Sequence, residues 1–340
     1  ASRRVRVLVR KRPFFAYEDE RGDLDVVSVH EGRRAVVVHN CCMYPDLRGM
    51  YVRHAEFGAC EAFGAAATTA EVCERGVGAE LRNVAAGGCS TIFMYGQTGS
   101  GKTFTMAGIE AAAAAMLLPR DGGGGGDGAA AGHLSYFEIA GTKLVDLLAA
   151  GKNQELSLKQ DKDGKVQAVG ARQLPVSDGP ELLRALASAK SRRATQATGA
   201  NSVSSRSHAV CRLTLPAAPG KRRPAALVLV DCAGSERKED SAHHSAERRR
   251  EGAEINQSLH ALKECMRTWT MVEEGRVGVH VPYRSSPLTR VLKESFTRRD
   301  TLMAVVGTLS PASQDTEHSI CTLKTITAIA ASGGSMRETK

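Results

Sequence analysis

The chain has 340 residues and a formal net charge of +9, with 46 Lys and Arg residues against 37 Asp and Glu residues. The basic excess indicates an acidic partner, whereas an aromatic content of 4% argues against a nucleic-acid binder that stacks bases on its side chains. No apolar run approaches the roughly 20 residues of a membrane span, so no membrane protein is expected. The nine cysteines lack the spacing of a zinc site or a disulfide framework, which indicates reduced thiols and a cytosolic protein.

In chain order, short apolar segments that are typical of strands alternate with helical patterns. The expected strands cover residues 5–9, 90–95, 135–139, 210–215, 227–231 and 304–309. The expected helices cover residues 68–85, 180–189, 253–271 and 288–296. This alternation predicts an α/β fold with a central, mostly parallel sheet that helices flank on both faces. We expect residues 1–340 to form a single domain, which begins without a signal peptide or an initiator methionine, as part of a longer protein would.

Two segments are expected to lie outside the core of this domain. Residues 109–132 contain two alanine runs and five consecutive glycines, a low-complexity composition that indicates a surface insert. Residues 235–251 are polar and end in arginines, so we expect a loop in front of the helix at 253–271. The pair His243 and His244 in that loop is more typical of a solvated surface than of a metal site.

The strongest chemical signal is the segment at residues 96–103, which reads G-Q-T-G-S-G-K-T and fits the pattern G-x-x-x-x-G-K-T. Its members are Gly96, Gln97, Thr98, Gly99, Ser100, Gly101, Lys102 and Thr103. The glycines let backbone N–H groups converge on phosphate oxygens, and the N-terminus of the next helix adds a partial positive charge. Lys102 is expected to reach the β- and γ-phosphates, and the Thr103 hydroxyl to bind Mg²⁺. Because the segment follows a strand and opens a helix, it predicts a site for ATP with Mg²⁺ rather than a chance glycine turn.

Two further motifs fit the same chemistry. The segment D-C-A-G-S-E at residues 231–236 directly follows an apolar strand pattern. Asp231 is therefore expected to face Mg²⁺, and Gly234 to offer its N–H to a γ-phosphate. The segment N-S-V-S-S-R-S-H at residues 201–208 supplies hydroxyls for Mg²⁺ or phosphate and an arginine for charge. Alone, such a serine cluster is often an ordinary polar loop, but here it accompanies two phosphate-binding motifs.

Together, the three motifs resemble the kinesin superfamily, whose nucleotide-binding loop and two switch segments occur here in the family's order. The family's adenine-side motif R-x-R-P is matched by R-K-R-P at residues 10–13, and a tubulin-facing family segment is matched by H-V-P-Y-R at residues 280–284. The resemblance runs from about residue 5 to about residue 330. It implies a motor domain that binds ATP or ADP with Mg²⁺, hydrolyses ATP and acts on microtubules.

The resemblance also implies which residues hold the nucleotide and the metal. Besides the glycine loop, the expected nucleotide contacts are Arg10, Arg12, Pro13, Phe104 and Asn201. Mg²⁺ would be held by Thr103 and by Ser204 or Ser205, with Asp231 in the outer coordination sphere.

Catalytic and coupling roles follow from the same resemblance. Lys102 would stabilise the charge that develops on the transferred and leaving groups. Arg206 would pair with Glu236 only while a γ-phosphate is present, and Glu236 would also pass on the proton of the attacking water. The helix at residues 253–271 would transmit the change to tubulin.

A finer resemblance is to the internal-motor kinesins (kinesin-13), which depolymerise microtubules. The segments that carry it include D-G-K-V-Q-A-V-G at residues 163–170 and L-K-E-C at residues 262–265. The chain departs from that group where the group has K-V-D at the tip of an extended hairpin, because residues 44–50 read Y-P-D-L-R-G-M. It also has Pro287 where the family has a basic residue that meets tubulin.

Tubulin is acidic, which fits the positive net charge, and the resemblance indicates the surface that would meet it. The residues expected there are Asp46, Leu47, Arg48, Arg248, Arg249, Lys263, Glu264, Cys265, Tyr283 and Arg284. No nucleic-acid or membrane partner is expected, and the oligomeric state would be set by regions outside this chain. The expected location is the microtubule cytoskeleton of the cytoplasm, with the spindle and the flagellum as candidate structures.

Three functions remain open at this point. The first is a microtubule depolymerase, which the kinesin-13-like segments favour. The second is a translocating motor, which the altered hairpin tip allows. The third is a microtubule-binding scaffold with weak ATPase activity, although the catalytic positions of all three motifs are intact. A nucleic-acid-dependent NTPase would fit the charge but not the switch motifs.

Overall fold

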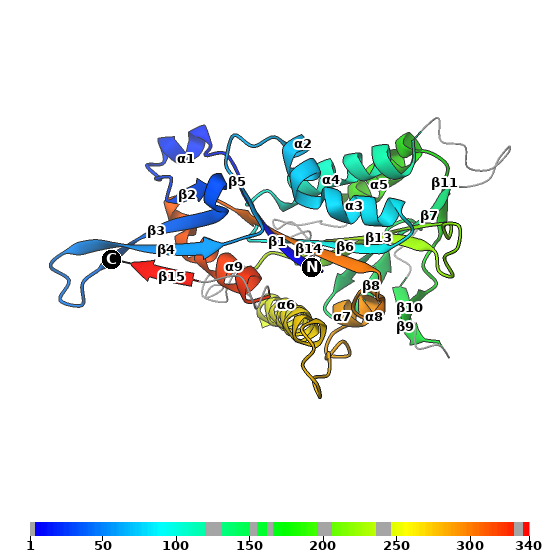
Figure 1. Ribbon diagram of the computed structural model, residues 1–340. Coiled ribbons are helices and arrows are strands. Elements are labelled where there is room, and N and C mark those ends of the chain that lie inside the picture. The colour runs from blue at the N-terminus through cyan, green and yellow to red at the C-terminus, as the bar shows by residue number, and fades with distance from the viewer. Residues whose placement is uncertain are drawn as a thin grey trace.

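The computed structural model describes residues 4–119, 131–149, 155–161, 166–195, 206–235, 246–329 and 336–339. One large sheet runs through this part of the chain, with helices on both of its faces (Figure 1). Its strands lie in the order β10-β9-β8-β7-β12-β13-β6-β14-β1-β5, and β11 pairs with β7. Their bounds are β1 Val5–Lys11, β5 Glu61–Phe63, β6 Cys89–Tyr95, β7 Gly132–Ala140, β8 Lys143–Asp146, β9 Glu155–Gln160, β10 Val166–Val169, β11 Leu174–Val176, β12 His208–Leu215, β13 Ala225–Asp231 and β14 Thr301–Leu309. The predicted α/β class is confirmed.

The sheet is parallel in its central part only. β6 pairs in parallel with β13 and β14, and β1 pairs in parallel with β14 and β5. On the other side of β13, the strands β12, β7 and β8 continue in antiparallel pairings. The expectation of a mostly parallel sheet therefore holds for the central strands, and the sheet as a whole is mixed. β6 and β13 are buried along their whole length, as parallel strands are when helices cover both faces.

Helices cover both faces of the sheet. In Figure 1, α2, η2, α3, α4 and α5 lie above it, and α6, α7, α8 and α9 lie below it. Their bounds are α2 Thr69–Glu71, η2 Val72–Val77, α3 Gly78–Ala85, α4 Lys102–Leu117, α5 Gly179–Thr195, α6 Ala246–Glu273, α7 Pro287–Val291, α8 Lys293–Thr297 and α9 Thr316–Ile329; short turns form α1 Ala16–Glu20, η1 Glu31–Arg33 and η5 Ser313–Asp315. The predicted helix at 68–85 changes to π geometry in η2, and the one at 288–296 is divided into α7 and α8.

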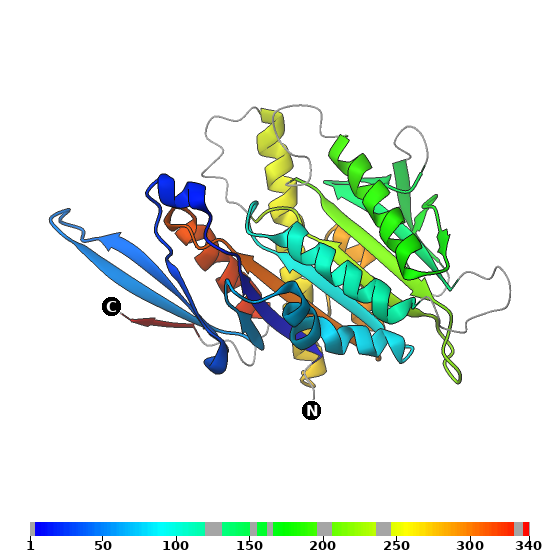
Figure 2. The ribbon, with the colours of Figure 1, turned by 90° about the horizontal axis from the view of Figure 1, so that it is seen from above.

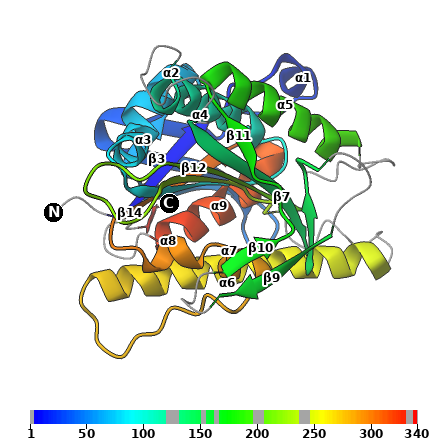
Figure 3. The same cartoon turned by 90° about the vertical axis from the view of Figure 1, so that its right-hand side faces the viewer.

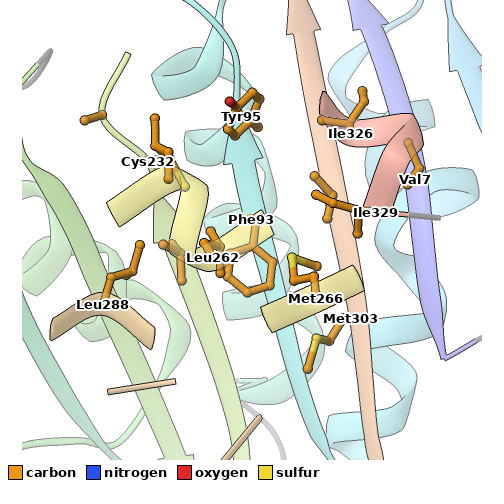
Figure 4. Packing of buried hydrophobic residues seen from close by; sticks show 14 of the residues in the cluster. Val7, Phe93, Tyr95, Cys232, Leu262, Met266, Leu288, Met303, Ile326 and Ile329 are labelled. Atoms are coloured by element: carbon orange, nitrogen blue, oxygen red, sulfur yellow. The ribbon is translucent and has the colours of Figure 1, made fainter. Parts of the chain in front are cut away.

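The lower core packs the helices α6 and α9 against the central strands. Figure 4 shows Leu262 and Met266 of α6 beside Phe93 of β6 and Met303 of β14, with Ile326 of α9 near β1. All five side chains are at most 3% exposed. Each such side chain contributes about 1.5–3 kcal/mol when it leaves water, so this packing fixes α6 firmly under the sheet.

A second, smaller sheet stands beside the main one. It has the order β15-β4-β3-β2, with β2 Val27–His30, β3 Ala35–Met43, β4 Met50–Gly58 and β15 Met336–Thr339. β3 and β4 form a long antiparallel hairpin that projects from one end of the molecule (Figures 1 and 2). At its tip, Leu47 adopts a left-handed conformation with φ of 58°, and the N–H of Arg48 donates to Oδ1 of Asp46 at 3.1 Å. This local hydrogen bond closes the turn without glycine at the left-handed position.

Both segments that were expected outside the core are partly helical. α4 continues to Leu117, and Ile109, Ala113 and Ala114 are buried under the upper helices, so the first part of residues 109–132 belongs to the core rather than to a surface insert. Alanine has the highest helix propensity, and the alanine run therefore extends the helix that begins after the glycine loop. The second segment, residues 235–251, is also partly helical, because α6 begins within it at Ala246. Residues 120–130 and 236–245 lie outside the described part of the chain.

In the described residues, none of the helices combines the length and the apolar character that crossing a membrane requires.

Candidate nucleotide-binding site

The glycine-rich segment lies where the sequence predicts it, between the end of β6 and the start of α4. Gly96, Gly99 and Gly101 have φ of 150°, 80° and 101°, in the region that favours glycine. A Cβ at Gly96 would approach the carbonyl oxygen of Thr308 to 2.5 Å, so the chain can only pass there without a side chain. By contrast, no described atom lies within 4 Å of a Cβ built at Gly99. The loop is thus anchored on β14 at one end and open at its middle.

Lys102 is the first residue of α4 and folds back onto the loop. Its side chain is buried, and Nζ donates to the carbonyl oxygens of Gly96 and Gln97, both at 2.8 Å. Ser100 fixes the same turn, because its Oγ donates to Gln97 O at 2.7 Å. The Thr103 side chain is exposed at the start of the helix, where it can meet a ligand. The cation and the hydroxyl that the motif requires therefore sit at one helix N-terminus.

The residues expected on the adenine side border the glycine loop. Arg12 at the end of β1 donates through Nε to Gly99 O at 2.9 Å and is held by Glu18. Arg10 lies over the ring of Phe104, with 5.3 Å from Cζ to the ring centroid. Phe104 is 69% exposed, and Pro13 is exposed as well, so a flat base can reach both. The structure therefore brings these four candidates together with the loop.

Asp231 lies at the end of β13, directly beside the strand that leads into the glycine loop. It is paired in register with Met94, and the N–H of Ser235 donates to Gly96 O at 3.3 Å. Asp231 is 9% exposed, and its Oδ1 is buried without a hydrogen-bond partner in the described part of the chain. A buried carboxylate oxygen without a partner is costly. A water bound to a cation would satisfy it, which fits the predicted outer-sphere role at Mg²⁺.

The other oxygen of Asp231 belongs to an ion-pair network that sequence reasoning missed. Arg193, near the end of α5, donates to Asp231 Oδ2 at 3.1 Å and to Glu138 Oε1 at 3.0 Å. It also donates to the carbonyl oxygen of Ser207 at 2.8 Å, and the Ser207 hydroxyl donates to Glu138. Burial alone would lower the pKa of Arg193, but the two carboxylates outweigh it and raise that pKa. No motif marks Arg193 in the sequence, because its partners come from distant strands.

His208, the last residue of the N-S-V-S-S-R-S-H segment, joins the site to α6. Its Nδ1 accepts from the N–H of Ala233 at 3.0 Å, and its Nε2 lies 2.6 Å from Oγ of Ser258. The N–H at Ala233 fixes the tautomer, so Nε2 carries the proton and donates to Ser258. Burial, reinforced by the charge of Arg193, lowers the pKa of His208 to about 3. A neutral imidazole therefore connects the segment after β13 with the long helix.

Several predicted site residues cannot be placed. Asn201, Ser204, Ser205 and Glu236 lie outside the described residues, and Arg206 is half-buried at the edge of the described part. Their roles, including the pair of Arg206 with Glu236, stay predictions. Gly234 lies within the described residues and is buried, shortly after the end of β13.

The expected tubulin contacts on the hairpin are solvent-exposed. Asp46, Leu47 and Arg48 lie at the hairpin tip, and Leu47 is 74% exposed. Arg284 is exposed, whereas Tyr283 is half-buried against the lower core, with the ammonium group of Lys293 over its ring at 5.1 Å.

The residues of α6 that were expected to contact tubulin differ in how far they are buried. Lys263 and Glu264 are half-buried, and Glu264 pairs with Arg267 at 2.8 Å. Cys265 is 0% exposed in the lower core, so its predicted contact with tubulin is wrong. Neighbouring residues on a helix point about 100° apart. Cys265 therefore points inward, whereas Lys263 and Glu264 lie at the border of the surface. Arg248 and Arg249 belong to the first turns of α6, and their side chains lie outside the described part.

The comparison with protein families decides the identity of the fold. The profile described as kinesin motor domain matches residues 10–329. The chain belongs to the kinesin motor domain family. Members of this family are, in general, ATPases that bind nucleotide with Mg²⁺ and act on microtubules. The predicted family is thereby confirmed.

Curated relatives of this kinesin motor domain cover nearly all of it. It is 36% identical over 319 residues to the diatom spindle kinesin-1 of Cylindrotheca fusiformis. It is 35% identical over 327 residues to the kinesin-like protein KIF24 of Homo sapiens and 34% identical over 327 residues to the kinesin-like protein KIN-13B of Arabidopsis thaliana. Each alignment covers 94% of this chain but only 49%, 23% and 46% of the respective relative. The chain thus spans less than half the length of these relatives.

Proposed function

We propose that this chain is a Mg²⁺-dependent, ATP-hydrolysing motor domain that acts on microtubules, and that it shortens microtubules as internal-motor kinesins do. One observation carries the ATPase proposal. The buried Oδ1 of Asp231, without a partner in the described residues, lies at the strand end next to the glycine loop. Membership of the kinesin motor domain family supports both the binding of the nucleotide and the action on microtubules.

The side chains around the loop fit ATP with Mg²⁺. Thr103 and one of Ser204 and Ser205 would supply hard oxygen ligands for the metal, and Asp231 would accept a hydrogen bond from a water bound to it. Bound Mg²⁺ neutralises charge on the phosphates. Lys102 stabilises the charge that moves from the γ-phosphate to the leaving group, and water has little access to its buried stem.

Coupling from the nucleotide to the filament rests on the segment after β13. In this proposal Arg206 and Glu236 pair while the γ-phosphate is present and separate after hydrolysis. The segment is tied to α6 through His208, which bonds both Ala233 and Ser258. A movement of that segment therefore acts directly on the helix that carries Lys263 and Glu264.

Depolymerase activity is the finer part of the proposal. The name of the relative KIN-13B and the kinesin-13-like segments at residues 163–170 and 262–265 support it. The projecting hairpin supports it as well, because a long and exposed wedge suits the bending of a filament end. The tip sequence at residues 44–50 departs from that of the depolymerising group and favours the second candidate, a translocating motor.

The test is to add the purified protein and ATP to stabilised, fluorescent microtubules. Shortening at the filament ends is expected. Gliding of surface-bound filaments without shortening would replace the depolymerase by a translocating motor. Binding without either movement and without microtubule-stimulated ATP hydrolysis would leave only a scaffold.

A further inference from the structure

A pocket of about 530 Å³ lies on the lower face of the main sheet, away from the nucleotide site. Its floor is formed by β7, β12 and β13, and its walls by β10 on one side and by α7 and α8 on the other. Figure 3 shows β10, α7 and α8 beneath β7 and β12. The volume is within the range of sites that bind small molecules, about 300–1,000 Å³.

The floor of the pocket has an apolar half and a polar half, which the strand register sets side by side. Phe137 is the cross-strand partner of Val210, and both are buried. Ser135 is the partner of Arg212, and Val228 lies opposite Arg212 on the next strand. Cross-strand partners have Cβ atoms about 4.5–5.5 Å apart, so one small molecule can touch both halves.

The polar half is electrically balanced. Arg212 Nη2 donates to Glu294 Oε2 at 2.6 Å, and Glu294 also pairs with Arg298 at 3.6 Å. Arg298 is held in turn by Asp300 at 2.7 Å. Two cations therefore face two carboxylates. Of these four residues, Arg212 and Glu294 line the pocket, so an anionic ligand would be repelled by Glu294 and a cationic ligand by Arg212.

Two hydrogen-bond donors of the polar half remain available. Ser135 lines the pocket, and its Oγ makes no hydrogen bond within the described residues. Arg212 uses Nη2 for Glu294 and Nε for Thr214, but its Nη1 has no hydrogen-bond partner there. Donors without partners in a partly buried site favour a neutral acceptor, such as a carbonyl oxygen.

We propose that this pocket binds a neutral, flat apolar molecule that carries a carbonyl group. The ring lies on Phe137, Val210 and Val228, and the carbonyl oxygen accepts hydrogen bonds from Ser135 and Arg212. Because β10 and α7 form opposite walls, a bound molecule bridges the two elements. The proposal is independent of ATP hydrolysis and of microtubule binding.

Benzamide is a suitable probe, with benzoate and benzylamine as its charged counterparts. Binding is followed by methyl NMR of the protein, with the signals of Val210 and Val228 as reporters. We expect saturable shifts with benzamide and a dissociation constant of about 1–10 mM, as for a good ligand of this size. Benzoate and benzylamine should bind at least about tenfold more weakly. Equal shifts from all three compounds would overturn the proposal.

Three variants locate the site. Ala168→Trp places a large side chain at the half-buried wall on β10 and should abolish the benzamide shifts, whereas Ala187→Trp, on the exposed surface of α5, should leave them unchanged. Ser135→Ala should weaken benzamide about three- to tenfold and leave the binding of toluene unchanged. Shifts that persist in Ala168→Trp, or an equal loss for benzamide and toluene in Ser135→Ala, would show that the molecule binds elsewhere or without the hydrogen bond.

Discussion

Lys102 is the cation on which we expect phosphate binding to depend. Its Nζ rests on two carbonyl oxygens at 2.8 Å, which hold it at the mouth of the loop. Within the glycine loop it is the only residue that can place a positive side chain on the β- and γ-phosphates.

Lys102→Ala should therefore reduce the rate of ATP hydrolysis by at least about 100-fold, as the loss of a charge that stabilises the transition state does. The measurement is steady-state phosphate release with and without microtubules. Lys221→Ala removes an exposed lysine and should leave the rate unchanged. A near-normal rate in Lys102→Ala would refute the assignment.

His208 should make the stability of the fold depend on pH. Its pKa is about 3 in the folded chain, whereas an unfolded histidine titrates near pH 6.5. The unfolded state therefore binds more protons at acid pH, so the stabilisation is complete above about pH 6.5 and is lost as the pH falls toward 3. At pH 5 the loss amounts to about 2 kcal/mol of unfolding free energy.

The variant that isolates this effect is His208→Asn, since an asparagine amide can accept from Ala233 N–H without titrating. Urea unfolding at pH 7.5 and at pH 5.0 should show the wild type losing about 2 kcal/mol more than this variant between the two conditions. His133→Asn, at an exposed position, should lose as much as the wild type. An identical loss in the wild type and in His208→Asn would contradict the assignment.

At the scale of elements, the proposed function assigns the bending of the filament to the hairpin of β3 and β4, and most of the attraction to the filament to other surfaces. Its tip carries Asp46, Leu47 and Arg48, all exposed, while the other cations expected to meet tubulin lie on α6 and before α7. Charges at the rim of an interface mainly affect the encounter rate and its salt dependence.

Replacing Asp46, Leu47 and Arg48 by alanine should leave microtubule binding within about threefold of the wild type and abolish end shortening. The reason is that the proposed function makes the exposed hairpin the wedge that bends the filament, whereas attraction depends mainly on charges at the rim of the interface. Lys263→Ala is the matched variant, which should weaken binding at low salt and retain shortening at saturating protein. Equal shortening rates for the wild type and the triple variant would show that the hairpin is not the wedge.

At the scale of the whole molecule, nucleotide binding should stabilise the fold. A ligand that binds only the folded state at 100 times its dissociation constant adds about 2.7 kcal/mol. For 340 residues, at about 2.1 cal/mol/K of unfolding entropy per residue, this corresponds to a rise in Tm of about 4 °C.

Thermal unfolding with ADP and Mg²⁺ should show this rise, and chelation of Mg²⁺ by EDTA should remove most of it. Asp231→Asn should lose the part that depends on Mg²⁺ while retaining some response to ADP alone. A rise in Tm that is insensitive to EDTA would contradict the metal assignment.

The sequence by itself determined the fold class, the family and the glycine loop. These rest on local patterns: short apolar strand segments, a G-x-x-x-x-G-K-T segment between a strand and a helix, and motifs whose order alone is distinctive. The position of Asp231 was equally predictable, because an apolar strand pattern leads directly into it and parallel strands end at the same edge of a sheet.

Only the tertiary structure decided which side chains meet across long distances. Arg193 binds Glu138 and Asp231, and no local pattern encodes contacts between a helix end and two strands. Cys265 matched a surface motif by sequence but lies in the core, because the direction of a helical face depends on what packs against it. The pocket over Phe137 and Arg212 likewise arises only when distant strands and helices assemble around one face of the sheet.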